Sequence, residues 1–148
     1  MPSRLLIPVA LTTALLIVAA PAASARKNAA PVNTDTPRAG RAIAWFRAHI
    51  GATGWEDYCE RAVENSFGTS ARYADALENW NSGTEVRHRD WRKAPRGALV
   101  FWRTSAHGHV AISLGDGTVL STSAGGRIGR VKVTWFKNPL GWKRADWG

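Results

Sequence analysis

Three segments in the first half of the chain carry hydrophobic residues at helical spacing. The first predicts a helix that Thr36 or Asp35 caps, with Pro37 in its first turn, and that ends at Gly51. The second predicts a helix over residues 54–67, and the third predicts a helix that Ser70 caps and that runs to Trp80. The polar and basic stretch 84–96 that follows predicts a loop.

The second half of the chain changes to the periodicity of strands. Residues 98–102 form a continuous apolar run, which predicts a buried strand. Residues 108–114 predict a strand whose side chains point alternately to its two faces. Val110 and every second residue after it face the core, whereas His109 faces the other way.

Turn signals connect these strands. The sequence Gly115–Gly117 predicts a hairpin that leads into a partner strand over residues 118–123, and a further strand is predicted over 130–135. Pro139 and Gly141 predict an irregular tail. Helices followed by an antiparallel meander define an α+β domain.

The N-terminus carries the pattern of an export signal. Arg4 precedes an apolar stretch, and small residues follow this stretch up to Ala25. We therefore predict a signal peptide over residues 1–25, too short in its apolar part for a membrane span, so that no transmembrane anchor remains after cleavage. Residues 26–36 are predicted to be a disordered leader and residues 37–148 a single domain of a secreted protein.

The net charge of the chain indicates which partners it attracts, but it says nothing about the fold. The 148-residue chain has 20 Lys and Arg against 11 Asp and Glu, which gives a formal net charge of +9. Such a charge attracts nucleic acid, anionic lipid or the phosphate-bearing polymers of a bacterial wall, or it serves only as a soluble basic surface. The sequence contains no RNA-binding, helix-turn-helix or zinc motif, so we expect no specific nucleic-acid partner.

Tryptophan is abundant, with 8 residues in this short chain. Trp45 and Trp102 fall at core positions of a predicted helix and a predicted strand. Trp55, Trp91 and Trp142 are candidates for a surface on which sugar rings stack.

Cys59 is the single cysteine, so it cannot form a disulfide within the chain. It is an intermolecular link, a buried inert thiol or a reactive thiol. Its predicted position in the first turn of a helix favours the thiolate, because a helix N-terminus carries partial positive charge. Glu56, Asp57 and Glu60 would raise the pKa of the thiol if they pointed inward, whereas Arg61 would lower it.

His109 is the best candidate for the base that a nucleophilic cysteine needs. The alternation of its strand turns it away from the core face, and His107 shares that face. The alternative for His109 is a half-exposed surface histidine. Cys59, His107 and His109 are also a possible zinc set, although their spacing matches no zinc motif.

Together these segments resemble the NlpC-type cell-wall cysteine peptidases, which are papain-like and have the CHAP amidases as near relatives. The resemblance rests on the helix with a single cysteine near its start, on Pro95–Trp102, and on Gly108–Gly117, where the histidine opens a strand before a Gly-Asp-Gly turn. It implies a papain-like α+β domain, with helices before an antiparallel meander or half-barrel. It also implies Cys59 as nucleophile, His109 as general base, and a polar residue on the next strand that orients the imidazole.

Counting from His109 across the turn leads to Ser121 as this third residue, with Thr122 or Ser123 in its place if the register slips. The cysteine motif departs from the family pattern. The chain has Tyr58-Cys59-Glu60-Arg61 where the family usually has Asp-Cys-Ser-Gly. The departure changes the shape and charge of the pocket that receives the substrate.

The resemblance implies a secreted, wall-associated cysteine hydrolase that cleaves an amide bond of peptidoglycan, in a stem peptide or a cross-link. The candidate substrate-binding residues are Tyr58, Trp55, Trp91 and His107; we expect a monomer without cofactor or metal. The alternatives are a catalytically inactive wall-binding module on the same fold, a basic polyanion-binding protein, and an enzyme that transfers the acyl group to an acceptor other than water.

Overall fold

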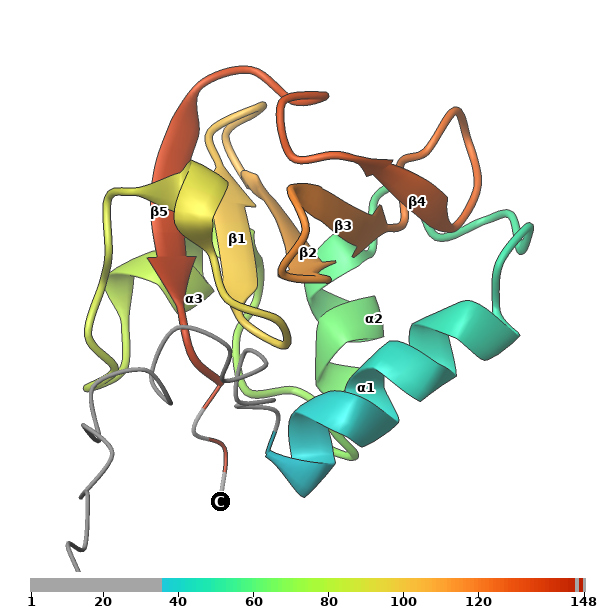
Figure 1. Ribbon diagram of the computed structural model, residues 1–148, viewed down its shortest axis with the longest axis horizontal. Helices are drawn as coiled ribbons and strands as arrows, with labels where there is room; N and C mark the ends of the chain where they lie inside the picture. Colours follow the sequence, from blue (N-terminus) through green and yellow to red (C-terminus); the bar gives the residue numbers. More distant parts are fainter. Residues whose placement is uncertain (1–35, 146, 148) are drawn as a thin grey trace, which may run out of the picture. The chain divides into compact units, whose positions relative to one another are not determined.

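The structure is a computed structural model that describes residues 36–145 and 147, so the predicted signal peptide lies outside the described residues, as does the predicted leader apart from its last residue. Three helices come first: α1 (Pro37–Ala48), α2 (Cys59–Ser66) and α3 (Ala76–Asn81). A 3-10 helix, η1 (Trp91–Lys93), precedes five strands: β1 (Leu99–Trp102), β2 (His109–Ser113), β3 (Thr118–Ser121), β4 (Gly129–Lys132) and β5 (Pro139–Lys143) (Figure 1). The predicted α+β class, with helices before an antiparallel sheet, is confirmed.

Local chemistry accounts for the bounds of α1. The Thr36 hydroxyl accepts a hydrogen bond from the Ala39 N–H at 3.2 Å, and Pro37 occupies the first helical position, where its missing N–H costs nothing. The chain then turns out of the helix, and Gly51 adopts φ +89°, a left-handed conformation that glycine favours.

The helix α2 begins later than the hydrophobic pattern predicts. Residues 54–58 form turns, in which the Tyr58 N–H donates to the Trp55 carbonyl at 3.0 Å. The helix therefore starts at Cys59 and not at Gly54. This correction moves Cys59 from within the first turn to the first helical residue, where its own N–H is free of intrahelical bonds.

The helix α3 also begins later than predicted. The carboxylate of Asp75, and not the hydroxyl of Ser70, caps it by accepting the Glu78 N–H at 2.8 Å. Ala71 has φ +53°, which is incompatible with a right-handed helix through residue 71.

The sheet is fully antiparallel, with strand order β4-β3-β2-β1-β5. The four strands predicted from the second half and the hairpin between β2 and β3 are present, although β4 ends at Lys132 and not at residue 135. His109 pairs with Trp102 across β1 and β2, so both side chains lie at the same end of the sheet.

The strand β5 was not predicted, because proline and glycine, here Pro139 and Gly141, ordinarily interrupt strands. Pro139 stands at the first position of β5, on the edge of the sheet, where a missing N–H is tolerated. Gly141 has φ +146°, and any side chain there would collide with the backbone carbonyl of His88, which bridges to Trp142. The prediction of an irregular tail was therefore wrong.

Hydrophobic side chains cover both faces of the sheet. On one face α1, α2 and α3 pack against β1, β2 and β3 around Phe46, Val63 and Ile112. On the other face η1 packs against β5, and Val100, Trp102 and Ala111 form a second core. In the described part of the chain, no helix has both the length and the apolar character needed to cross a membrane.

Candidate active site

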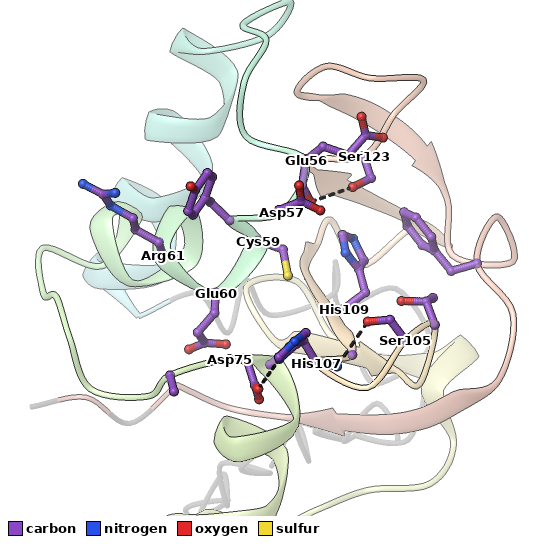
Figure 2. A pocket seen from close by; sticks show the side chains of 16 residues that line it. Glu56, Asp57, Cys59, Glu60, Arg61, Asp75, Ser105, His107, His109 and Ser123 are labelled. Carbon is purple, nitrogen blue, oxygen red and sulfur yellow. Dashed lines mark hydrogen bonds and ion pairs between the residues drawn. The ribbon is translucent and has the colours of Figure 1, made fainter.

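Cys59, His109 and Ser121 come from three different elements that converge at one end of the sheet. Cys59 begins α2, His109 begins β2 and Ser121 ends β3. A cavity of about 710 Å³ is lined by both Cys59 and His109, and Figure 2 shows the sulfur and the imidazole pointing into it. The start of the helix and the start of the strand therefore bring a thiol and an imidazole to the same space.

The environment of the Cys59 thiol combines burial with hydrogen-bond donors. Burial and, to a smaller extent, the negative charge of Glu60 raise the pKa of the thiol to about 11. The backbone N–H groups of Val110, Glu60 and Cys59 itself act in the opposite direction. The amides at the start of α2 thus favour negative charge at the thiol, although burial outweighs them.

His109 is buried and held by its neighbours. It is 5% exposed, and its ring lies 4.3 Å from that of Phe136 and 6.0 Å from that of Trp102, measured between ring centroids. The alternative of a half-exposed surface histidine was therefore wrong. Burial lowers the pKa of His109 to about 4, so the imidazole is neutral at pH 7.

Ser121 contacts the imidazole as expected from counting across the hairpin. Its hydroxyl oxygen lies 2.9 Å from Nε2 of His109 and accepts the N–H of Ser123 at 3.0 Å. This contact fixes the orientation of the ring through Nε2, so Nδ1 is the ring nitrogen that Ser121 does not hold. Of the three candidates, Ser121 is the one that contacts the imidazole, so neither Thr122 nor Ser123 takes this place.

The four predicted substrate-binding residues do not gather at one place. Tyr58 and His107 line the cavity, and Nδ1 of His107 lies 2.9 Å from the Asp75 carboxylate at its rim. Trp55 packs against the core on the helix side of the sheet, and Trp91 packs against the core on the opposite face. The roles of these four residues stay predictions.

The prediction that Trp142 contributes to a surface on which sugar rings stack was wrong. Trp142 is buried, stacks on His88 with ring centroids 3.8 Å apart, and donates its indole N–H to Asp90. The two tryptophans assigned to the core behave as expected, since Trp102 is fully buried and Trp45 packs against the helix-side core.

Sequence reasoning missed the burial of Glu60. The residue is 4% exposed and borders the cavity beside Cys59. Arg61 instead turns away from the cavity, and its guanidinium carbon lies 5.9 Å from the centroid of the Tyr58 ring (Figure 2). Arg61 therefore does not lower the pKa of the thiol. No local signal marks Glu60 as buried, because its partner Asn79 lies on another helix.

The described residues, 36–145 and 147, contain no group of three or more His, Cys, Asp or Glu side chains that could hold a metal ion. Cys59 and His109 line the cavity with His107, but the three do not form such a group.

No family model and no curated protein matches the chain. Solved structures do match. The peptidoglycan hydrolase RipB of Mycobacterium tuberculosis superposes with a TM-score of 0.56 at 17% identity, over 72% of this chain and 63% of that one. The P60 domain of an antigen from M. avium subspecies paratuberculosis gives 0.53 at 17% identity, over 72% and 93%.

A third match is an NLP/P60 family lipoprotein of Staphylococcus aureus, with a TM-score of 0.54 at 20% identity over 77% of this chain and 43% of that one. The fold defined by the helices and the five-stranded sheet is therefore that of the NlpC/P60 proteins. The resemblance to NlpC-type peptidases that the sequence indicated is confirmed at the level of the fold. The chain spans less than two thirds of the length of RipB and of the lipoprotein.

Proposed function

We propose that the protein is a cysteine hydrolase that cleaves an amide bond of peptidoglycan, in a stem peptide or in a cross-link. The observation that carries the proposal is the meeting of Cys59, at the start of a helix, with His109, bound to Ser121, at a single cavity. The NlpC/P60 fold supports a role at the cell wall, since RipB, which has this fold, is a peptidoglycan hydrolase.

The neutral state of both groups dictates the first step of the proposed mechanism. Because the pKa of Cys59 is about 11 and that of His109 about 4, the pair carries no charge at pH 7. Proton transfer from the thiol to Nδ1 therefore accompanies attack of the sulfur on the amide carbonyl. Ser121 holds the imidazole by Nε2 during this transfer and acts as a positioning residue.

The remaining steps follow from acyl transfer. As the carbon–sulfur bond forms, the carbonyl oxygen gains charge that the Cys59 N–H at the start of α2 can stabilise. The imidazolium gives its proton to the leaving amine, and the carbon–nitrogen bond breaks to leave a thioester. Water, deprotonated by His109, then hydrolyses the thioester and restores the thiol.

The proposal includes a secreted or wall-associated monomer that acts without a cofactor. The net charge of +9 supports contact with the anionic polymers of a bacterial wall. The predicted signal peptide supports export.

A specific observation favours a second candidate, a wall-binding module without catalytic activity. Burial holds both Cys59 and His109 in their neutral forms, and Ser121 offers the imidazole no negative charge to stabilise a cation. A domain with this arrangement would bind peptidoglycan in the same cavity but leave its amide bonds intact.

The test is digestion of purified peptidoglycan by residues 26–148 and by the same protein with Cys59→Ala. Released fragments are identified by mass spectrometry, and co-sedimentation of each protein with the wall is measured in parallel. New fragments from the unaltered protein alone support the hydrolase, and their masses identify the bond. Identical fragment patterns, with both proteins sedimenting with the wall, would replace the hydrolase by the binding module.

A further inference from the structure

A second cavity, away from the one that Cys59 borders, has a basic lining. Its volume is about 510 Å³, and among the described residues it shares no lining residue with the cavity beside Cys59. Its charged lining residues are Arg38, Arg41 and Arg72, and no described carboxylic side chain lines it. We call this hollow the arginine cavity, because three positive charges gather there without an acidic group in its described lining.

The arginine cavity lies where two helices meet, at the end of α2 that is farther from Cys59. Arg38 and Arg41 belong to α1, and Ser66, another lining residue, ends α2. The helices α1 and α2 pack against each other (Figure 1). Since a helix rises about 1.5 Å per residue, Ser66 lies about 10 Å along the axis from Cys59. A ligand in this cavity therefore has no need of the thiol.

Arg38 and Arg41 stand at the end of α1 where helices ordinarily carry acidic residues. The first turn of α1 contains no acidic side chain. The N-terminus of a helix has a partial positive charge, which disfavours cations there. The two arginines are also three positions apart, so they share one surface of the helix and repel each other. Both effects cost the helix stability, and an anion bound between the two side chains would offset them.

Arg72 comes from the segment that follows α2, and aromatic rings hold its side chain. Its guanidinium carbon lies 5.4 Å from the centroid of the Trp147 ring and 6.0 Å from that of the Tyr73 ring. Such contacts orient a guanidinium but do not neutralise its charge. Within residues 36–145 and 147, no carboxylate forms an ion pair with any of the three arginines.

The neighbouring part of α2 does not cancel this charge. Its C-terminus contributes about half a negative charge, against three full positive charges. Glu64 of this helix is buried and does not line the cavity, and its Oε1 accepts the backbone N–H groups of Arg72 and Tyr73 at 2.9 Å. Asn65 and Thr69 add an amide and a hydroxyl to the lining, and both groups can donate hydrogen bonds to an anion.

The two tryptophans that line the cavity are already engaged within the protein. Trp147 is 3% exposed, and the half-buried Trp45 stacks on His49 with ring centroids 3.9 Å apart. Proteins that bind single-stranded nucleic acid rely on exposed aromatic faces on which bases stack. The arginine cavity therefore suits an anionic chain without bases better than a nucleic acid.

We propose that the arginine cavity binds phosphodiester groups of a polyol-phosphate polymer of the bacterial wall and so anchors the protein there. Guanidinium groups match the oxygens of a phosphate with paired N–H donors. Successive phosphates of such a polymer bring several negative charges to the three arginines. The inference takes the location at the wall from the proposed function, but the binding itself involves neither Cys59 nor His109.

The binding experiment compares a hexamer of glycerol phosphate with a hexamer of thymidylate, which has the same linkage but carries bases. The affinity of residues 26–148 for each is measured by calorimetry at low salt. We expect the glycerol phosphate hexamer to bind more tightly than the thymidylate hexamer. Arg41→Gln and Arg72→Gln should each weaken its binding about tenfold, as is typical when a charge-assisted hydrogen bond is lost.

The matched control is Arg47→Gln, which removes the same charge from the same helix. Arg47 is exposed in the last turn of α1 and does not line the cavity. Its variant should bind like the unaltered protein. Arg41→Gln relieves the repulsion at the start of α1, so its urea unfolding should show no loss of stability, which excludes misfolding as the cause of weaker binding.

Three results would overturn the proposal. The first is no binding of the glycerol phosphate hexamer by the unaltered protein. The second is an equal loss of affinity in Arg41→Gln and Arg47→Gln, which would indicate attraction by net charge alone. The third is binding of the thymidylate hexamer at least as tightly as the glycerol phosphate hexamer, which would assign the cavity to nucleic acid.

Co-sedimentation separates the anchor from the proposed function. Walls are used as isolated and after hydrofluoric acid treatment, which cleaves phosphodiesters, with the unaltered protein, Cys59→Ala and Arg41→Gln. We expect the first two proteins to sediment with untreated walls more than with treated ones, and Arg41→Gln to lose this difference. Hexamer binding without any digestion of peptidoglycan overturns the hydrolase alone, whereas digestion without hexamer binding overturns the anchor alone.

Discussion

The Glu60→Gln variant is expected to be more stable than the unaltered protein, by an amount that grows with pH. Burial raises the pKa of Glu60 from 4.5 to about 8, so the folded protein keeps a protonated carboxyl where the unfolded chain has a carboxylate. The stability that this group contributes is fully present below pH 4.5 and is lost as the pH rises through about 8. Glutamine has no charge to titrate and therefore does not show this loss.

The magnitude follows from the two pKa values. A displacement from 4.5 to about 8 corresponds at most to about 5 kcal/mol, since each factor of ten in the proton equilibrium is worth about 1.4 kcal/mol. Glu60 is only 4% exposed, so solvent screens the effect weakly. Between pH 5 and pH 8 the free energy of unfolding of Glu60→Gln should therefore rise relative to that of the unaltered protein by about 3 to 4 kcal/mol.

The assay is urea unfolding, followed by tryptophan fluorescence, at a series of pH values from 5 to 8 with linear extrapolation to water. Asp116→Asn provides a control whose effect should not change with pH in this range. The hydroxyl and N–H of Thr118 and the charge of Arg130 lower the pKa of Asp116 below 3.8, so its contribution is constant from pH 5 to 8 and is lost only at lower pH. Unfolding free energies of the Glu60→Gln and unaltered proteins that stay parallel from pH 5 to 8 would refute the reasoning.

Three further predictions concern the site and its support. Ser121→Ala removes the contact at Nε2 of His109 and should lower the rate of fragment release about tenfold. Ser121→Asn, which also offers the ring an oxygen, should restore part of the rate. Equal rates in all three proteins would exclude a positioning role for Ser121. Burial raises the pKa of Cys59 to about 11, so iodoacetamide should label it more slowly than free cysteine at pH 7, and the labelling rate should rise above pH 9. Labelling faster than that of free cysteine at pH 6 would instead indicate a thiolate paired with an imidazolium. Lys143→Met removes the buried cation that pairs with the largely enclosed Glu85 carboxylate, and it should cost about 3 kcal/mol in urea unfolding. Adding Glu85→Gln should recover part of this loss, and a loss that the second change does not alter would show that the pair is not coupled.

The features that were predictable from the sequence are those with a short-range cause. The alternation around Val110 and the Gly-Asp-Gly turn determine β2, β3 and their register, and this register is what brings Ser121 to His109. The start of α1 was predictable because Thr36 caps it. In each case the determining residues lie within a few positions of one another along the chain.

The features that were missed depend on partners far away in the sequence. Gly141 lies in a strand because the backbone of His88 leaves no room for a side chain there, and nothing near Gly141 in the sequence indicates this. Glu60 is buried and bound to Asn79 of α3, whereas a glutamate near a helix start is ordinarily exposed. A hydrophobic pattern cannot report such tertiary contacts.

The pairing of the first strand with the last has a consequence for the order of events during synthesis. Leu99 of β1 pairs with Lys143 of β5, and Phe136, which covers the His109 ring, also comes late in the chain. A growing polypeptide therefore carries its thiol and imidazole well before the residues that enclose them have been translated. Since such distant pairings form slowly, we expect the thiol and the imidazole of a nascent chain to stay incompletely enclosed until Phe136 and β5 have been translated and have joined the sheet.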